Sequence, residues 1–163
     1  LLGFYTLIFY LLRESENKLS NFFDKRIKIA FVLFFLTGAT GSITALADVL
    51  FPSASFVEGF IEDFDSTSEV LTRLRILHPF VSTILSIFLF SESNRFKKEF
   101  AIDASIIKVL VIVGVILGVL NVVSNIILPL SILHLLLADL LWITYVYKAV
   151  EKATLLKIPQ NID

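Results

Sequence analysis

Four long apolar stretches constrain the fold of this chain more than any other feature. They cover residues 27–50, about 74–90, about 106–123 and about 130–147, and the first carries no charge between Lys28 and Asp48. About 20 apolar residues are enough to cross a bilayer as a helix, which satisfies its own backbone polar groups. With 56% hydrophobic and only 18% charged residues, a soluble globular domain is excluded. The sequence therefore predicts an all-α membrane protein containing a four-transmembrane-helix bundle.

The first residues indicate that the bundle is preceded by other structure. Residues 1–12 (LLGFYTLIFYLL) are apolar but too short to cross a membrane alone. A signal peptide would need a basic segment before them and small residues at a cleavage site, and neither is present. We interpret residues 1–26 as the tail of a further helix and a cytoplasmic loop, and the chain as part of a longer one. Residues 27–150 then form the bundle, and residues 151–163 form a cytoplasmic C-terminal tail.

The distribution of basic residues predicts the orientation. Twelve of the 14 Lys and Arg residues fall on one side of the predicted membrane, and only Arg73 and Arg75 fall on the other. Because the side rich in basic residues is normally cytoplasmic, the loop 51–72 is expected outside and the C-terminus inside. We expect this arrangement in the plasma membrane of a bacterium or an archaeon.

The two histidines of the chain lie near the starts of two spans that run in the same direction. His78 follows Arg75 by about one turn, and His134 follows Pro129 by about one turn. Imidazoles are costly in hydrocarbon and usually functional, and equal depth would let them hold one flat ligand. We predict that His78 and His134 are the axial iron ligands of one haem b. Two alternatives remain: each histidine bonds only a neighbouring helix, or the pair binds a bare metal, for which Asp139 lies too deep and on another face.

Arg73 and Arg75 are candidate partners for haem propionates, because guanidinium groups pair well with carboxylates. Arg75 is favoured, since it lies three residues before His78 on the same face. The alternatives are that these side chains extend to lipid headgroups or pair with acidic residues of the outer loop.

Other polar and small residues have structural interpretations. Asp48 and Asn121 are expected to make contacts between helices, and Asp139 either does the same, helps to move protons or tunes the cofactor. Pro79 is expected to kink its helix. Close helix packing is expected at two pairs of small residues, Gly38 with Gly41 and Gly114 with Gly118.

Several chemistries are excluded by what the sequence lacks. It has no cysteine, which rules out disulfides, iron–sulfur clusters and thiolate zinc sites within this chain. It has no phosphate-binding loop, no Ser/His/Asp set and no basic patch for nucleic acid. We assign no catalytic residue.

Three stretches resemble the C-terminal half of haem A synthase. They are TGATGSITALADVLFP at residues 37–52, RLRILHP at residues 73–79, and LLADLLW at residues 136–142 behind His134. The resemblance runs over about residues 27–150. It implies an eight-helix membrane protein of two similar halves, which oxidises a methyl group of haem O to the formyl group of haem A for terminal oxidases. It also implies that the N-terminal half holds the substrate and a catalytic glutamate, and that His78 and His134 hold haem b. The extracytoplasmic cysteines that the family often carries are missing here.

Two functions from different classes follow. The chain is the haem b-binding half of a haem A synthase, with haem O as the substrate of the complete enzyme. Alternatively, it is a membrane b-type cytochrome that acts only in electron transfer, because an iron closed by two histidines has no position open for oxygen. The expected partners are membrane lipid and either a missing N-terminal half or a second copy of the chain.

Overall fold

The structure, a computed structural model, describes residues 25–96 and 101–155, with the side chains of residues 25–95 and 104–148. The described residues are helical and contain no strand. The four long helices are α3 (Lys25–Leu50), α6 (Leu77–Phe96), α7 (Ala101–Val123) and α8 (Leu128–Leu155), and two short helices, α4 (Phe56–Phe64) and α5 (Val70–Leu74), connect α3 to α6. The predicted tail of a preceding helix and the last C-terminal residues lie outside the described residues.

Four segments of the described chain are long and apolar enough to cross a membrane. These segments are Lys25–Leu50, Val70–Arg95, Ala104–Val123 and Leu128–Lys148. Large apolar side chains are exposed along the outer faces of the bundle, among them Phe35, Ile87 and Leu135. Such surfaces would cause aggregation in water but are ordinary against lipid tails. The predicted all-α membrane class is confirmed.

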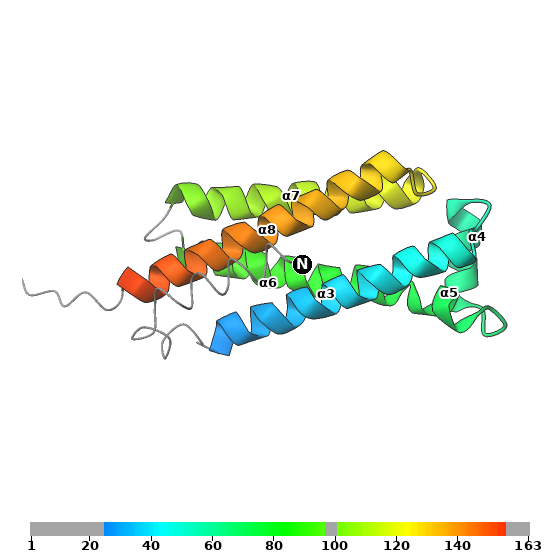
Figure 1. Cartoon of the computed structure of the whole chain (residues 1–163), viewed down its shortest axis with the longest axis horizontal. Helices are drawn as coiled ribbons and strands as arrows, with labels where there is room; N and C mark the ends of the chain where they lie inside the picture. Colours follow the sequence, from blue (N-terminus) through cyan, green and yellow to red (C-terminus); the bar gives the residue numbers. More distant parts are fainter. Residues whose placement is uncertain (1–24, 97–100, 156–163) are drawn as a thin grey trace, which may run out of the picture.

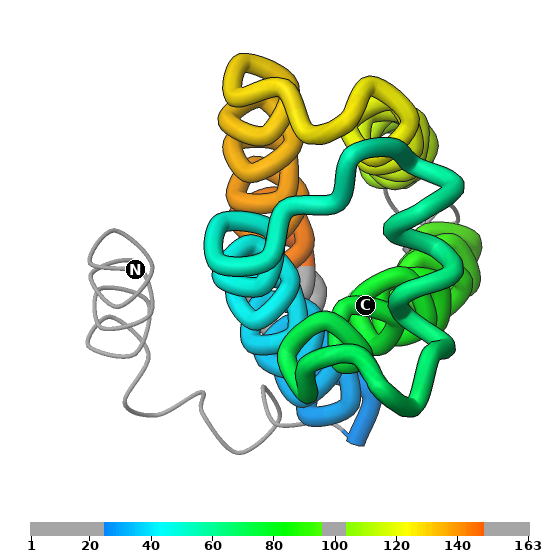
Figure 2. The backbone as a smooth tube through the Cα atoms, turned by 90° about the vertical axis from the view of Figure 1, so that its right-hand side faces the viewer, coloured from blue at the N-terminus to red at the C-terminus, as the bar shows by residue number. Residues whose placement is uncertain are grey.

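The long helices form an antiparallel bundle. Helix α3 packs against α6, α6 against α7, and α7 against α8, and a view along the bundle shows the four in that order around a common axis (Figure 2). Helices α6 and α8 both start at the end covered by α4 and α5 (Figure 1). We call this the histidine end, because it contains His78 and His134, and we call the opposite end the packed end.

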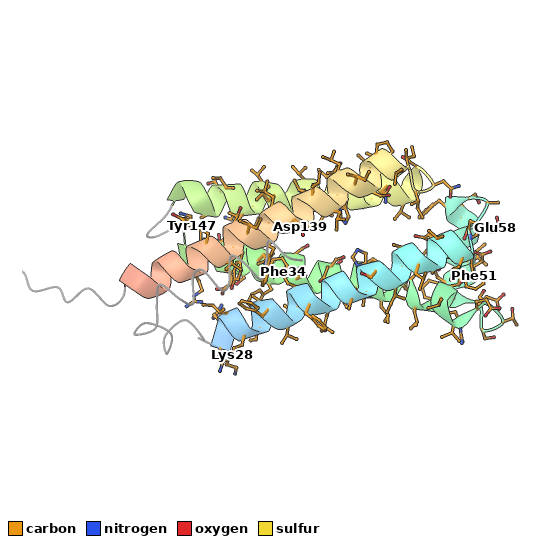
Figure 3. The ribbon with its side chains drawn as sticks, in the orientation of Figure 1. Lys28, Phe34, Phe51, Glu58, Asp139 and Tyr147 are labelled. Atoms are coloured by element: carbon orange, nitrogen blue, oxygen red, sulfur yellow. The ribbon has the colours of Figure 1, made fainter. Side chains whose placement is uncertain are left out.

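The packed end contains the apolar core. Its buried residues come from all four long helices: Ala30, Leu85, Leu89, Ala104, Ile107, Val111, Trp142, Tyr145 and Val146. The Trp142 ring meets Phe31 and Phe34 edge-on, with ring centroids 4.9 and 4.5 Å apart. These aromatic contacts join the first and last long helices, and Figure 3 shows Phe34 and Tyr147 toward this end.

The kink expected at Pro79 coincides with a break in the helical path just before this residue, and Pro79 itself lies in the first turn of α6. A proline in a helix interior would deprive the carbonyl four residues earlier of its donor, and here that carbonyl belongs to Arg75. It accepts instead from the His78 backbone N–H at 3.2 Å and from the Thr44 hydroxyl at 3.4 Å. The chain is interrupted between α5 and α6, just before the proline, and α6 begins anew two residues before it. In α8, Pro129 lies in the first turn, as expected.

Candidate functional site

The imidazoles of His78 and His134 face each other across the histidine end. Their ring centroids are 6.5 Å apart and their planes are nearly perpendicular, at 89°. His78 is the second residue of α6, and His134 lies two turns into α8. The two helices run in the same direction (Figure 1), so the equal depth expected from the sequence is confirmed.

This separation suits two ligands of one metal ion. Two imidazoles bound to opposite sides of an ion, with metal–nitrogen bonds of about 2 Å, hold their ring centroids roughly 6 Å apart. The described residues contain no group of three or more His, Cys, Asp or Glu side chains that could hold an ion by themselves. A haem iron is already bound by the porphyrin and takes only one or two axial ligands from the protein. The donor set of the described residues therefore fits a haem better than a bare metal.

The two rings differ in their hydrogen bonds. The His78 Nδ1 lies 3.5 Å from the Thr40 hydroxyl. A histidine that binds metal through one nitrogen usually has the other oriented by such a contact. The His134 Nδ1 is buried and has no partner among the described residues. Unpaired buried polar atoms are rare in native structures, so this nitrogen is a sign of a partner that the described residues do not supply.

Two glycines lie directly against these rings, and sequence reasoning assigned them only to helix packing. A Cβ placed on Gly41 of α3 would lie 3.0 Å from the His78 Cε1, and one placed on Gly118 of α7 would lie 3.2 Å from the His134 Cε1. The sequence feature that could have indicated this contact was a pair of small residues in each neighbouring span, Gly38 with Gly41 in α3 and Gly114 with Gly118 in α7. Helix packing alone is an incomplete explanation, because the closest neighbours of these two glycines are the imidazoles.

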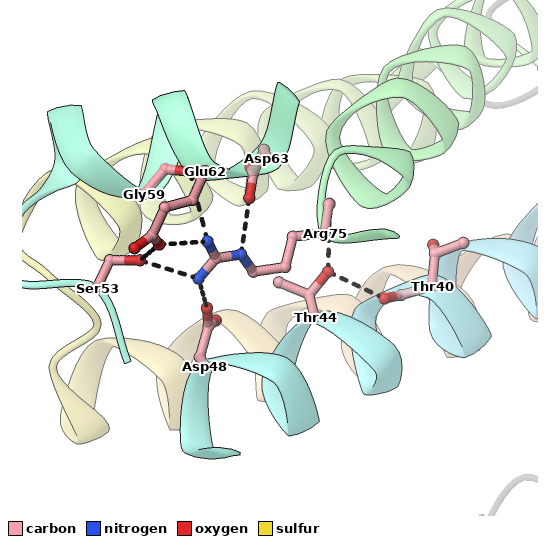
Figure 4. A network of polar contacts seen from close by, with 8 residues as sticks. All are labelled: Thr40, Thr44, Asp48, Ser53, Gly59, Glu62, Asp63 and Arg75. Atoms are coloured by element: carbon pink, nitrogen blue, oxygen red, sulfur yellow. Dashed lines mark hydrogen bonds and ion pairs between the residues drawn. The ribbon is translucent and has the colours of Figure 1, made fainter. Parts of the chain in front are cut away.

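Arg75 is buried and joins three helices at the histidine end (Figure 4). A guanidinium has five N–H donors, and here five hydrogen bonds of 2.8–3.4 Å run to Asp63, Asp48, Ser53, Glu62 and the Gly59 carbonyl. The structure thus realises one alternative left open by the sequence, pairing with acidic residues of the loop. No donor of Arg75 remains for a propionate in this arrangement, whereas Arg73 is exposed.

The Arg75 cluster carries an excess of negative charge, since one arginine faces the carboxylates of Asp48, Glu62 and Asp63. Burial raises the pKa of the Asp63 carboxyl above its usual value, although the hydrogen bond and the charge of Arg75 act in the opposite direction. The cluster fixes α4 and α5 over the end of α3. It therefore builds the outer rim of the site from polar contacts.

The remaining polar candidates lie apart from the two rings. Asn121 of α7 accepts a hydrogen bond from Ser131 of α8 at 3.1 Å, and Asp48 bonds Arg75, so both make the expected contacts between helices. Asp139 lies about halfway along α8 with an exposed side chain (Figure 3). None of its three proposed roles is supported by a contact among the described residues.

Comparison with known proteins places the chain in a family. Residues 2–146 match the family described as cytochrome oxidase assembly protein. Similar curated proteins include two named protoheme IX farnesyltransferase, from two strains of Thermus thermophilus, each 30% identical over 122 residues. The aligned region covers 72% of this chain but 20% of each relative, so the chain spans only a fifth of the length of these proteins.

No solved structure matches the chain significantly. The family match nevertheless extends over most of the chain and includes both histidine-bearing helices. It confirms the resemblance to haem A synthase seen in the sequence: the chain belongs to the family of cytochrome oxidase assembly proteins.

Proposed function

We propose that this chain is the haem b-binding half of a haem A synthase, with His78 and His134 as the two axial ligands. The observation that carries the proposal is the 6.5 Å separation of the two imidazoles. Membership of the cytochrome oxidase assembly family supports a role in that assembly, and haem A is the product that terminal oxidases need. Bound haem b supplies one-electron transfer to this site.

Each residue of the site has a defined task in this proposal. His78 and His134 would hold the iron, and the contact of His78 with Thr40 orients its ring. An iron held by both histidines would have no position open for oxygen. We therefore assign oxidation of haem O to another part of the complete protein, and electron transfer or support of that part to this chain.

The test is production of residues 1–163 in cells that make haem O but lack haem A synthase, followed by extraction and chromatography of the haems. We expect no haem A from this chain alone and haem A when the complete protein is produced. The His134→Ala variant of the complete protein should lose that product. Haem A made by residues 1–163 alone would contradict the division of tasks.

A membrane cytochrome that only transfers electrons is the second candidate. It is favoured by the two facing imidazoles, with ring centroids 6.5 Å apart, because an iron held by both would have no position open for oxygen. The same experiment separates the candidates. A complete protein that binds haem b but yields no haem A would favour the cytochrome.

We also propose that the loop 51–72 is extracytoplasmic and the C-terminus cytoplasmic, on the basis of the basic residues. The chain contains no cysteine, so a single introduced cysteine is the only thiol. An impermeant thiol reagent added to intact cells should label Ser66→Cys, an exposed position, and should not label Asn161→Cys. The opposite pattern would reverse the orientation.

A further inference from the structure

The two histidines have the same relation to a glycine on a neighbouring helix. Gly41 of α3 lies against the His78 ring of α6, and Gly118 of α7 lies against the His134 ring of α8. Each of these helix pairs packs antiparallel, and the two pairs together make the bundle (Figure 1). The site is therefore built from two similar helix pairs, α3 with α6 and α7 with α8, and in each pair a glycine of one helix lies against the imidazole of the other.

The glycines one turn away on the same helices provide an internal comparison. A Cβ on Gly38 would meet nothing within 4 Å, and one on Gly114 would only touch the Leu137 Cδ2 at 3.4 Å, an ordinary contact. A methyl group is therefore tolerated at these positions. Among these four glycines of α3 and α7, only Gly41 and Gly118 have a neighbour closer than an ordinary contact, and that neighbour is a histidine ring.

We propose that Gly41 and Gly118 are positioning residues that set the orientation of the two imidazole planes, and through them the ligand field of the iron. This inference rests on the proposed haem ligation. A methyl at Gly41 would lie 3.0 Å from the His78 Cε1 and 3.2 Å from its Nδ1, closer than van der Waals contact. The ring lies at the end of a rotatable side chain, so it would turn or shift before the helix backbone does.

The two positions should not respond equally. The His78 Nδ1 lies 3.5 Å from the hydroxyl of Thr40, the residue before Gly41 on α3, so a methyl at Gly41 must disturb this contact or the bond to iron. The His134 Nδ1 has no hydrogen-bond partner among the described residues, and its glycine contact is looser, at 3.2 Å. We expect Gly41→Ala to have the larger effect, and Gly118→Ala to rotate the ring with ligation retained.

Electron paramagnetic resonance of the ferric, haem-loaded complete protein tests this inference. Nearly perpendicular imidazole planes leave two iron d orbitals close in energy, which gives a low-spin signal with one strongly displaced g value. We expect this signal in the unaltered protein and in the controls Gly38→Ala and Gly114→Ala. Gly118→Ala should shift the displaced g value, and Gly41→Ala should also produce a high-spin fraction and carbon monoxide binding after reduction.

The outcomes separate this inference from the proposed function. An unaltered protein without a low-spin haem signal would contradict the ligation itself. A normal signal that stays the same in both Gly41→Ala and Gly118→Ala would overturn only the role of the glycines. If Gly41→Ala fails to accumulate, the milder Gly118→Ala carries the test. Failure of both variants while both controls accumulate would also overturn the inference, since it would make these glycines requirements of folding.

Discussion

The two ends of the bundle differ in their apolar packing. The packed end buries aliphatic and aromatic residues from all four long helices, centred on Trp142 and Tyr145, and beside them the charged side chains of Glu92 and Lys148. At the histidine end, the described residues bury Ala47, Thr72 and Arg75, and a network of charged groups holds the rim together. Since apolar packing and the candidate ligands occupy opposite ends, stability and haem binding should respond to different substitutions.

Trp142→Ala should have the largest effect on stability. The ring is buried against Phe31 and Phe34, and its removal should lower the free energy of unfolding by about 3 kcal/mol. Titration of the purified protein with a denaturing detergent measures this loss. The haem spectrum at full folding should not change, because the substitution lies far from His78 and His134. A changed spectrum would mean that the two ends are coupled.

The matched control is Leu133→Ala, next to His134 on α8. Its side chain is 48% exposed, so truncation should change the free energy of unfolding by less than about 0.5 kcal/mol. A loss as large as that of Trp142→Ala would mean that the histidine end contributes to stability as much as the packed end does.

Arg75→Gln should have the next largest effect. It leaves the carboxylates of Asp48, Glu62 and Asp63 without their shared cation. We expect a loss of about 2 kcal/mol, below the value for a fully buried pair because these carboxylates are partly hydrated. In the folded state, Arg75→Gln should retain haem nearly as well as the unaltered protein. Arg73→Gln should instead weaken haem retention and leave the free energy of unfolding unchanged. The reverse pattern would restore Arg75 as the propionate partner.

The sequence predicted much of the bundle. Long apolar stretches locate membrane helices well, because a bilayer accepts few other structures, and the alternation of spans then placed His78 and His134 at one depth. The contacts of Asp48 and Asn121 were also expected. These features depend on helix length and direction, which can be read locally.

The details of the histidine end could not be predicted in the same way. Lipid and helix contacts are both apolar, so a hydrophobic pattern does not tell which face of α3 or α7 points inward. For this reason Gly41 and Gly118 could not be matched to the histidines. The partners of Arg75 depend on the fold of α4 and α5 within a loop, where several carboxylates were equally plausible. Pro79 did indicate the break before α6, although the sequence placed the start of this span at about residue 74 and α6 begins at Leu77.

The most direct test of the central claim is the optical and paramagnetic resonance spectrum of the purified, haem-loaded protein and of its His78→Ala and His134→Ala variants. The chain has only two histidines, so no third imidazole of this chain can replace a lost ligand. We predict one low-spin, six-coordinate haem held by these two histidines in the unaltered protein, and its loss or conversion to high spin in each variant. An unaltered low-spin spectrum in either variant would contradict the account.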